Sequence, residues 1–300
     1  MKISHIRAVM VFLCLFIPQI VSAAYIFTAP PRETAKTGHK VYESVATFLT
    51  KSTGYRFEYR QQDTWKEYVK GMRNEQYDLV FDGPHFVDWR VHNIGHRVLV
   101  KIPHLLQWRV IVRSDNTSVS KLEDLAGKKV CAPGSPNFGM LNLFNHFKDA
   151  GKQPIHVEVK GWNNVYDAVK SGNCVAGVLP KKNHKIYDKV GAYTRTLHTH
   201  LPYPNQAFTV SSRISEGLGD SIREALLSEE GQKALENLRK RYTGGSKLVS
   251  AEDEEYDSIY MLLINAENFS NNGGAKKNAT GKKNSWALKN NNVDSVRGYN

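Results

Sequence analysis

Long apolar runs, cysteine and the common catalytic motifs are all scarce in this sequence. Beyond residue 23, no stretch is long and apolar enough to predict a transmembrane helix. The sequence holds no G-x-S-x-G, Walker A or H-E-x-x-H pattern, and no pairing of a nucleophile with a base stands out. We therefore expect a protein that is not an enzyme and that carries no cofactor.

The one apolar run lies at the N-terminus. Lys2 and Arg7 precede the apolar residues 8–17, and the small residues Val21-Ser22-Ala23 come before Ala24. This is the pattern of a secretory signal peptide, because the run is too short to cross a bilayer. Cys14 has no lipobox before it, so the pattern favours an exported protein over a lipoprotein. We expect cleavage near Ala23 and a periplasmic location.

Two cysteines remain after the leader. Cys131 ends a predicted strand at 129–132, and Cys174 opens another at 174–179. In an oxidising compartment, two cysteines on neighbouring strands can form a disulfide. The alternatives are two buried free thiols or a thiolate site for a soft metal.

Acidic residues are fewer than basic ones, 29 against 41, which gives a formal net charge of +12. The leader contributes +2 and the last thirty residues contribute +5, so +5 belongs to the residues between them. The tail, 271–300, is rich in Asn, Gly and Lys and is predicted to be disordered. In an exported chain we interpret it as a solvated appendage and expect no nucleic-acid partner. The mildly basic body fits an anionic ligand.

Residues 24–270 alternate between strand and helix patterns, which is typical of an α/β protein. In the first part, a parallel sheet with helices on its faces is predicted. A polar linker at 114–118 separates it from a second alternating set. The predicted strands are 24–29, 55–59, 79–81, 98–100, 108–112, 129–132, 156–159, 175–179, 193–197 and 207–211. The predicted helices include 41–49, 65–72, 137–149, 163–171, 182–189, 215–227, 230–242 and 254–263.

This order predicts one domain interrupted by another. The strand at 207–211 could return the chain to the first domain, so the two crossovers should lie near 110–114 and 200–209. Ligand sites favour such interfaces, and hinge closure around the ligand is the usual behaviour. We predict a first lobe of 24–112 with 205–270, and a second lobe of 113–204.

The segment Tyr77–Arg90 is a candidate ligand loop. An apolar run at 79–81 stops at Asp82-Gly83-Pro84, and a helical pattern follows with Phe86 and Arg90. Asp82 is suited to cap this helix, and proline is tolerated in a first turn. In open α/β sheets, ligands bind beyond the carboxyl ends of strands, where helix N-termini offer N–H groups. An ordinary strand-to-helix loop is the alternative.

Four segments resemble one known family. FTAPPRE at 27–33 matches its opening, and YDLVFDGP at 77–84 is similar to its DLAFLGP segment. LEDLAGKKV at 122–130 resembles its entry to the second domain, and DAVKSG at 167–172 with VAGV at 175–178 resembles a later segment. In these places, the chain resembles the phosphate/phosphite/phosphonate substrate-binding proteins of ABC transporters. The resemblance covers nearly all of 24–241.

The resemblance implies a two-lobed type II periplasmic binding fold. It also implies an anion held between the lobes and a membrane permease as partner. The second-lobe loop departs from the family, because Pro136-Asn137-Phe138-Gly139 stands where a Ser-Thr-Ser-Gly run is typical. Gly161-Trp162-Asn163 stands where the family has Gly-Ser-His. These departures weaken the case for a tetrahedral oxyanion and favour an aromatic, amide-lined site.

The candidate ligand-binding residues come from both lobes and from the return crossover. Each has a structural alternative: Arg32 as a surface charge, Asn137 as a helix cap, Trp162 as a packing residue, and Tyr203 as part of a proline-shaped turn. The full set is Arg32, Asp82, Gly83, His85, Phe86, Ser135, Asn137, Trp162, Asn163, Tyr203 and Asn205.

His198 and His200 are two apart on a predicted strand and would share a face, but no third ligand is evident. We predict no metal site. The sequence thus predicts a monomeric solute-binding protein that captures a small anionic, phosphonate-like molecule for an ABC importer. The alternative is a sensory module that passes its ligand state to a membrane receptor or histidine kinase. An enzyme on the same scaffold is the third class.

Overall fold

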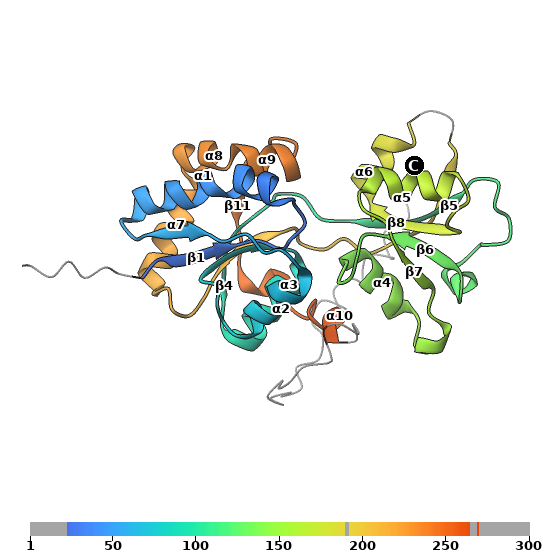
Figure 1. Ribbon diagram of the computed structural model, residues 1–300, viewed down its shortest axis with the longest axis horizontal. Helices are drawn as coiled ribbons and strands as arrows, with labels where there is room; N and C mark the ends of the chain where they lie inside the picture. The colour runs from blue at the N-terminus through green and yellow to red at the C-terminus, as the bar shows by residue number, and fades with distance from the viewer. Residues whose placement is uncertain (1–22, 190–191, 265–268, 270–300) are drawn as a thin grey trace, which may run out of the picture.

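The computed structural model describes residues 23–189, 192–264 and 269. The predicted signal peptide, apart from Ala23, and the predicted basic tail lie outside this part of the chain. Two separate sheets form, one toward each end of the molecule in Figure 1. We call the part around the six-stranded sheet the first lobe and the part around the five-stranded sheet the second lobe.

The first-lobe sheet has the order β11-β4-β10-β3-β1-β2. Strands β1, β2 and β3 are parallel, as the alternating pattern predicts, whereas β10 runs antiparallel to both β3 and β4. The return strand therefore enters the middle of this sheet. The strands are β1 (Tyr25–Thr28), β2 (Phe57–Tyr59), β3 (Leu79–Asp82), β4 (Arg97–Lys101), β10 (Ala207–Val210) and β11 (Val249–Ser250).

The second-lobe sheet has the order β7-β6-β8-β5-β9. Strands β6, β7 and β8 are parallel, and β5 pairs antiparallel with both β8 and β9. The strands are β5 (Trp108–Arg113), β6 (Lys129–Ala132), β7 (Ile155–Glu158), β8 (Ala176–Pro180) and β9 (Thr194–Thr199).

The position of β5 corrects the predicted first crossover. Residues 108–112 were expected in the first lobe, with the crossing near 110–114, but β5 forms hydrogen bonds within the second sheet. The chain therefore crosses between Lys101 and Trp108, and it returns between Thr199 and Ala207. The two crossovers run side by side, because Leu106 and Tyr203 form an antiparallel bridge between them.

Helices cover the sheets in both lobes (Figure 1). In the first lobe these are α1 (Ala35–Thr53), α2 (Trp65–Arg73), α3 (Pro84–Ile94), α7 (Glu216–Leu227), α8 (Glu229–Ala234), α9 (Glu236–Tyr242) and α10 (Met261–Ile264). In the second lobe they are α4 (Phe138–His146), α5 (Trp162–Lys170) and α6 (Lys181–Tyr187). Short 3₁₀ turns lie at Leu122–Leu125, Ala150–Lys152 and Asp253–Tyr256. Within the described residues, no helix has both the length and the apolar character needed to span a bilayer.

Local end signals explain where several helices stop and start. Gly54 adopts a left-handed conformation and ends α1, as expected of a glycine after a helix. The predicted helix 137–149 is shorter than expected, because Phe147 is extended. The predicted helix 230–242 is two helices that meet at Leu235. The predicted helix 254–263 is also divided, since Ser258 has a φ of 68° that no right-handed helix can include.

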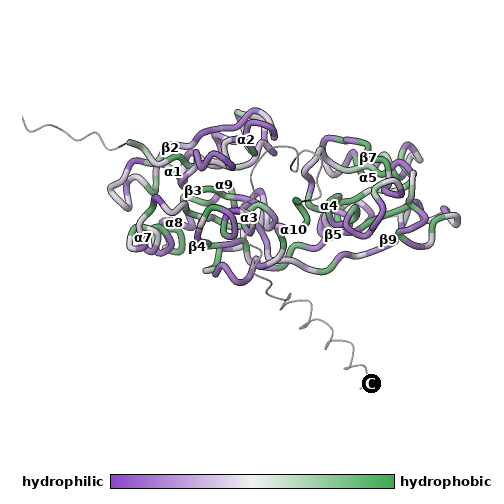
Figure 2. Tube along the Cα trace, turned by 90° about the horizontal axis from the view of Figure 1, so that it is seen from below, coloured by the Kyte–Doolittle hydropathy of each residue, from purple (hydrophilic) through white to green (hydrophobic). Residues whose placement is uncertain are grey.

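Apolar segments run through the interior of both lobes, and polar segments lie toward the outside (Figure 2). The largest buried cluster belongs to the first lobe and includes Phe27, Phe81 and Phe208. The lobes also touch each other through α4. Its Leu141 packs in one cluster with Phe86 of α3 and Leu263 of α10. This contact joins α4 of the second lobe to α3 and α10 of the first lobe.

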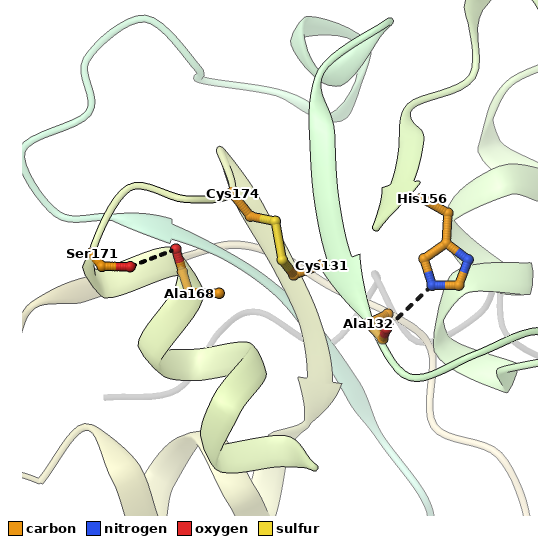
Figure 3. The surroundings of a disulfide bond; sticks show 6 residues. All are labelled: Cys131, Ala132, His156, Ala168, Ser171 and Cys174. Carbon is orange, nitrogen blue, oxygen red and sulfur yellow. Dashed lines mark hydrogen bonds between the residues drawn. A yellow bond between two sulfur atoms is a disulfide. The ribbon is translucent and has the colours of Figure 1, made fainter. Parts of the chain in front are cut away.

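Cys131 and Cys174 form the predicted disulfide, with their Cα atoms 5.8 Å apart. Figure 3 shows the bridge between β6 and the turn that follows α5. Both side chains are buried with Val165 of α5. The bond therefore joins the α5–β8 turn to β6 inside the second lobe, and the alternative of two free thiols was wrong.

Candidate functional site

The segment predicted as a ligand loop does connect a strand to a helix, but its details differ from the prediction. Asp82 is the last residue of β3, and Gly83 caps α3 without a side-chain bond. Asp82 is therefore not the helix cap. Pro84 occupies the first turn as expected. Because proline lacks an N–H, and the N–H of Phe86 bonds the Gly83 carbonyl, this helix end offers few free donors.

Asp82 is instead the centre of a buried polar network. Its carboxylate is 1% exposed and accepts hydrogen bonds from Arg90 Nη1 at 2.7 Å, the Gly83 N–H at 2.6 Å, and the Tyr68 hydroxyl. Arg90 is fully buried and also donates to the Tyr68 hydroxyl. Hydrogen bonds between charged groups in such a dry setting are strong. The network therefore fixes the end of β3 and the start of α3 relative to each other.

Arg32 reaches this network from the loop between β1 and α1. Its Nη2 lies 3.8 Å from Asp82 Oδ1, and its guanidinium lies over the Tyr242 ring at 5.7 Å. Its Nε and Nη2 are buried and have no hydrogen-bond partner among the described residues. Buried polar atoms are almost always satisfied, and the exceptions need an explanation. Two guanidinium groups thus share one carboxylate. Arg90 forms a hydrogen bond to it, whereas Arg32 is paired with it only by charge, at 3.8 Å, and keeps two donors without a hydrogen bond.

His85 lies beside these groups at the second position of α3. The space for its ring depends on Gly83, since a Cβ there would lie 3.1 Å from the ring. Both ring nitrogens are buried. Burial is the main cause that lowers the pKa of His85 to about 3; the Pro136 carbonyl opposes this shift, and the charges of Arg32 and Arg90 add to it. The imidazole is therefore neutral at physiological pH.

The second lobe meets His85 through the loop after β6. Phe138, the first residue of α4, stacks its ring on His85 with centroids 4.9 Å apart. The Ser135–Pro136 peptide bond is cis, and Asn137 caps α4 by accepting a bond from the Met140 N–H at 3.2 Å. The capping alternative for Asn137 is therefore confirmed. Ser135 is half-buried in the same loop.

The remaining second-lobe candidates take structural contacts. Trp162 begins α5 and packs edge-on against Trp108, with ring centroids 5.2 Å apart. The packing alternative for Trp162 is therefore confirmed. Asn163 is exposed and bonds its neighbour Asn164. The ligand contacts predicted for Trp162 and Asn163 stay predictions.

The crossover candidates also have partners. The Tyr203 hydroxyl donates to Asn142 Oδ1 of α4 at 2.7 Å, and its ring packs against Phe138. Asn205 bonds the His104 carbonyl of the other crossover, and its own carbonyl accepts from Tyr256. Tyr203 thus adjoins the loop that faces His85, while Asn205 connects the two crossovers.

The structure therefore gathers only part of the predicted set. Arg32, Asp82, Gly83 and His85 lie together in the first lobe, and Phe86 is buried below them in the core. The Ser135–Phe138 loop covers His85 from the second lobe. Surface hollows of about 350 and 260 Å³ lie elsewhere, along α8–α9 and beside the Leu122–Leu125 turn. Neither of these two hollows is lined by the grouped residues.

Four residues of this group were not predicted as ligand-site residues: Tyr68, Arg90, Phe138 and Tyr242. Tyr68, Phe138 and Tyr242 contact Asp82, His85 and Arg32, respectively. Each comes from a different part of the chain, so no local pattern joins them. Arg90 could have been found, because it shares the buried face of α3 with Phe86, where a charged side chain needs a partner.

His198 and His200 lie with their rings 4.9 Å apart on β9 and just after it. Within the described ranges, no three potential metal ligands cluster. His200 is buried, and burial lowers its pKa to about 3.

Solved structures share this two-lobed arrangement. The structure of XAC2383 from Xanthomonas citri bound to ATP has a TM-score of 0.65 at 13% identity, covering 80% of this chain and 96% of that one. PhnD1 from Prochlorococcus marinus in complex with methylphosphonate has a TM-score of 0.59 at 16% identity, with the same two coverages. A binding protein component of an ABC phosphonate transporter from Pseudomonas aeruginosa has a TM-score of 0.57 at 13% identity, covering 80% and 85%. At these identities, the likeness shows the fold.

Two sheet-centred lobes joined by two crossovers define a type II periplasmic binding protein, as predicted. The family described as "ABC transporter, phosphonate, periplasmic substrate-binding protein" matches residues 27–256. The chain belongs to this family, and its role is solute binding for an ABC importer. Among curated proteins, no sequence matches this chain.

Proposed function

We propose that this protein binds a small oxoanion of the phosphate or phosphonate kind between its lobes, with Arg32 as the anchor. The observation that carries the proposal is that Nε and Nη2 of Arg32 are buried and have no hydrogen-bond partner among the described residues. These two donors form the planar fork that matches two oxygens of a phosphonate or carboxylate. PhnD1, which has the same fold, is described in complex with methylphosphonate.

The first lobe holds the guanidinium in place before the ligand arrives. Asp82 lies on one side, and the Tyr242 ring lies below the guanidinium plane. Tyr242 is itself fixed, because its hydroxyl donates to Glu33 at 2.6 Å and lies 2.9 Å from the Tyr42 hydroxyl. A pre-positioned donor pair loses little entropy when it binds.

The second lobe completes the site when the lobes close. The Met140 N–H of α4 is bonded to the Asn137 cap, but the first two N–H groups, of Phe138 and Gly139, have no acceptor within the helix, so they can donate to oxygens of the ligand. Ser135 and the amide of Asn137 are further donors in the same loop. A ligand that bonds Arg32 and this loop together is bound best by the closed arrangement, and it shifts the population toward that arrangement.

The test is calorimetry on the mature chain with methylphosphonate, phosphite, phosphate, methanesulfonate and sulfate. We expect at least one to bind and Arg32→Met to weaken it at least thirtyfold, since truncating one partner of a buried charged hydrogen bond costs about 2 to 5 kcal/mol. Arg32→Lys keeps the charge but loses the fork, and it should weaken binding less.

Arg56→Met is the matched control, because Arg56 is exposed at β2 and pairs only with the exposed Glu58 among the described residues. It should leave binding unchanged. If no oxoanion binds, or if Arg32→Met and Arg56→Met bind alike while both are folded by circular dichroism, the proposal fails.

We further propose that residues 1–23 direct export and are removed, and that the monomeric mature protein delivers its ligand to a membrane permease without changing it chemically. The apolar run and the small residues before Ala24 support the first point. Mass spectrometry of the exported chain should give an N-terminus at Ala24. Ligand recovered after denaturation should be chemically intact, and the chain should sediment as one copy.

A further inference from the structure

The charges around Arg32 do not cancel. Arg32 and Arg90 contribute two positive charges, and Asp82 contributes one negative charge. The neighbouring Glu33 carboxylate is paired separately with Arg241 and with the Tyr242 hydroxyl. The first-lobe side of the site therefore carries one net positive charge in a setting with little solvent.

His85 adds no charge to this count. Its pKa of about 3 keeps it neutral, because burial, Arg32 and Arg90 together outweigh the opposing effect of the Pro136 carbonyl. A neutral imidazole has one nitrogen that donates and one that accepts. Both His85 nitrogens are buried. The Pro136 carbonyl acts on one of them as a hydrogen-bond acceptor, which leaves the other nitrogen to accept. The site therefore includes one acceptor that an anion without a hydrogen atom on oxygen cannot satisfy.

The second-lobe loop that faces His85 brings no cation to the site. The loop Pro133–Gly139 contains no charged side chain. The carboxylate of Glu158 lies against Gly134 of this loop, where an added Cβ would be 2.6 Å from Glu158 Oε1. The charge that lies against this loop is thus negative. The second-lobe cation Lys182 of α6 instead lies beside Gly244 of the first lobe, where an added Cβ would be 3.3 Å from its Nζ.

We propose that the site selects singly charged oxoanions that keep one O–H group, such as a hydrogen phosphonate, over doubly charged ones. This rests on the proposed oxoanion function of the same site. Two ligand oxygens accept from Nε and Nη2 of Arg32, and the ligand O–H donates to the accepting nitrogen of His85. A dianion would leave that nitrogen unsatisfied and would bring one more negative charge than the site neutralises.

The experiment measures the affinity of the mature chain for methylphosphonate between pH 5.5 and 8.5. Only the singly protonated form should bind well, so the affinity should fall about tenfold per pH unit above the second pKa of methylphosphonate. Methanesulfonate is singly charged throughout this range and has no O–H, so it should bind more weakly and with no pH dependence. Sulfate, a dianion throughout, should bind least.

A His85→Phe variant separates the roles of charge and of the accepting nitrogen. It keeps an aromatic ring for Phe138 to stack on but removes both nitrogens. It should lower the affinity for methylphosphonate at pH 5.5 about tenfold and leave methanesulfonate within twofold, since one buried hydrogen bond to a charged ligand is lost. Thermal unfolding shows whether the variant is folded.

The outcomes separate this inference from the oxoanion function itself. If methylphosphonate binds as tightly at pH 8.5 as at pH 5.5, or if sulfate binds more tightly than methanesulfonate, the charge selection is refuted and the oxoanion function stands. If methanesulfonate loses affinity in parallel with methylphosphonate, the pH dependence belongs to the protein, and the inference is again refuted. If no oxoanion binds at any pH, the function proposed for the site fails as well.

Discussion

Replacing Arg90 by methionine tests whether the buried network holds the first lobe together. Arg90 is fully buried, and its Nη1 lies 2.7 Å from Asp82 Oδ2. Methionine has a similar length but no charge, so the nearly buried Asp82 carboxylate would lose its strongest partner. Removing one member of a buried ion pair costs about 3 to 5 kcal/mol, because the other charge is left uncompensated. This is a large share of the roughly 5 to 15 kcal/mol that stabilises a typical domain.

The assay is urea unfolding followed by circular dichroism, with the midpoint and slope measured for each variant. Arg56→Met is the control at an exposed ion pair, and it should change the free energy of unfolding by less than about 0.5 kcal/mol. In the double variant Arg90→Met with Asp82→Asn, the loss should be smaller than the sum of the two single losses. A loss below about 1 kcal/mol for Arg90→Met, similar to the control, would show that the network does not stabilise the lobe as argued.

Three further predictions concern other parts of the chain. Cys174→Ser opens the disulfide with Cys131, whose sequence separation is 43, and should cost up to about 4 kcal/mol in urea unfolding. Asp88 has a pKa raised to about 7 by burial, so the native state holds its proton more tightly than the unfolded chain does. Stability should therefore fall as pH rises from about 4 to 7 and level off above 7, and Asp88→Asn should flatten this slope. Phe138→Leu should weaken oxoanion binding about two- to tenfold in calorimetry, because the stacking on His85 is lost.

Each of these has an outcome that contradicts it. Reduced wild-type protein should have the same free energy of unfolding as Cys174→Ser. A Cys174→Ser variant as stable as the oxidised protein would show that the disulfide does not stabilise the fold. An unchanged pH slope in Asp88→Asn would mean that Asp88 does not titrate near neutrality. Full affinity in Phe138→Leu, with the fold intact, would mean that this ring does not contribute to the closed state.

The sequence predicts those features that depend on neighbours in the chain. Gly54 and Pro84 mark helix ends through their backbone conformations, and Asn137 caps its helix through a bond three residues away. The disulfide was also predictable, since strands that alternate with helices in one small lobe become neighbours. The alternation of strands and helices, interrupted by a polar linker, itself predicts the two-lobed fold.

The features that depend on distant residues were missed or misplaced. Asp82 looked like a helix cap, because nothing nearby shows that Arg90 and Arg32 both reach it. The strand at Trp108–Arg113 was assigned to the wrong lobe, because a buried apolar strand has the same sequence pattern in either sheet. Phe138 looked like a departure from a hydroxyl-rich loop, and only the structure shows its ring on His85.

The C-terminal segment changes what opening of the lobes requires. Strand β11 anchors it to the first-lobe sheet, and the Tyr256 hydroxyl donates to the Asn205 carbonyl on the return crossover. Further on, Leu263 of α10 packs with Leu141 of α4 in the second lobe. A simple rotation about the two crossovers would pull this contact apart. To open, the protein must either separate α10 from α4 and expose apolar surface to water, or let α10 travel with the second lobe, so that part of the resistance to opening comes from the end of the chain.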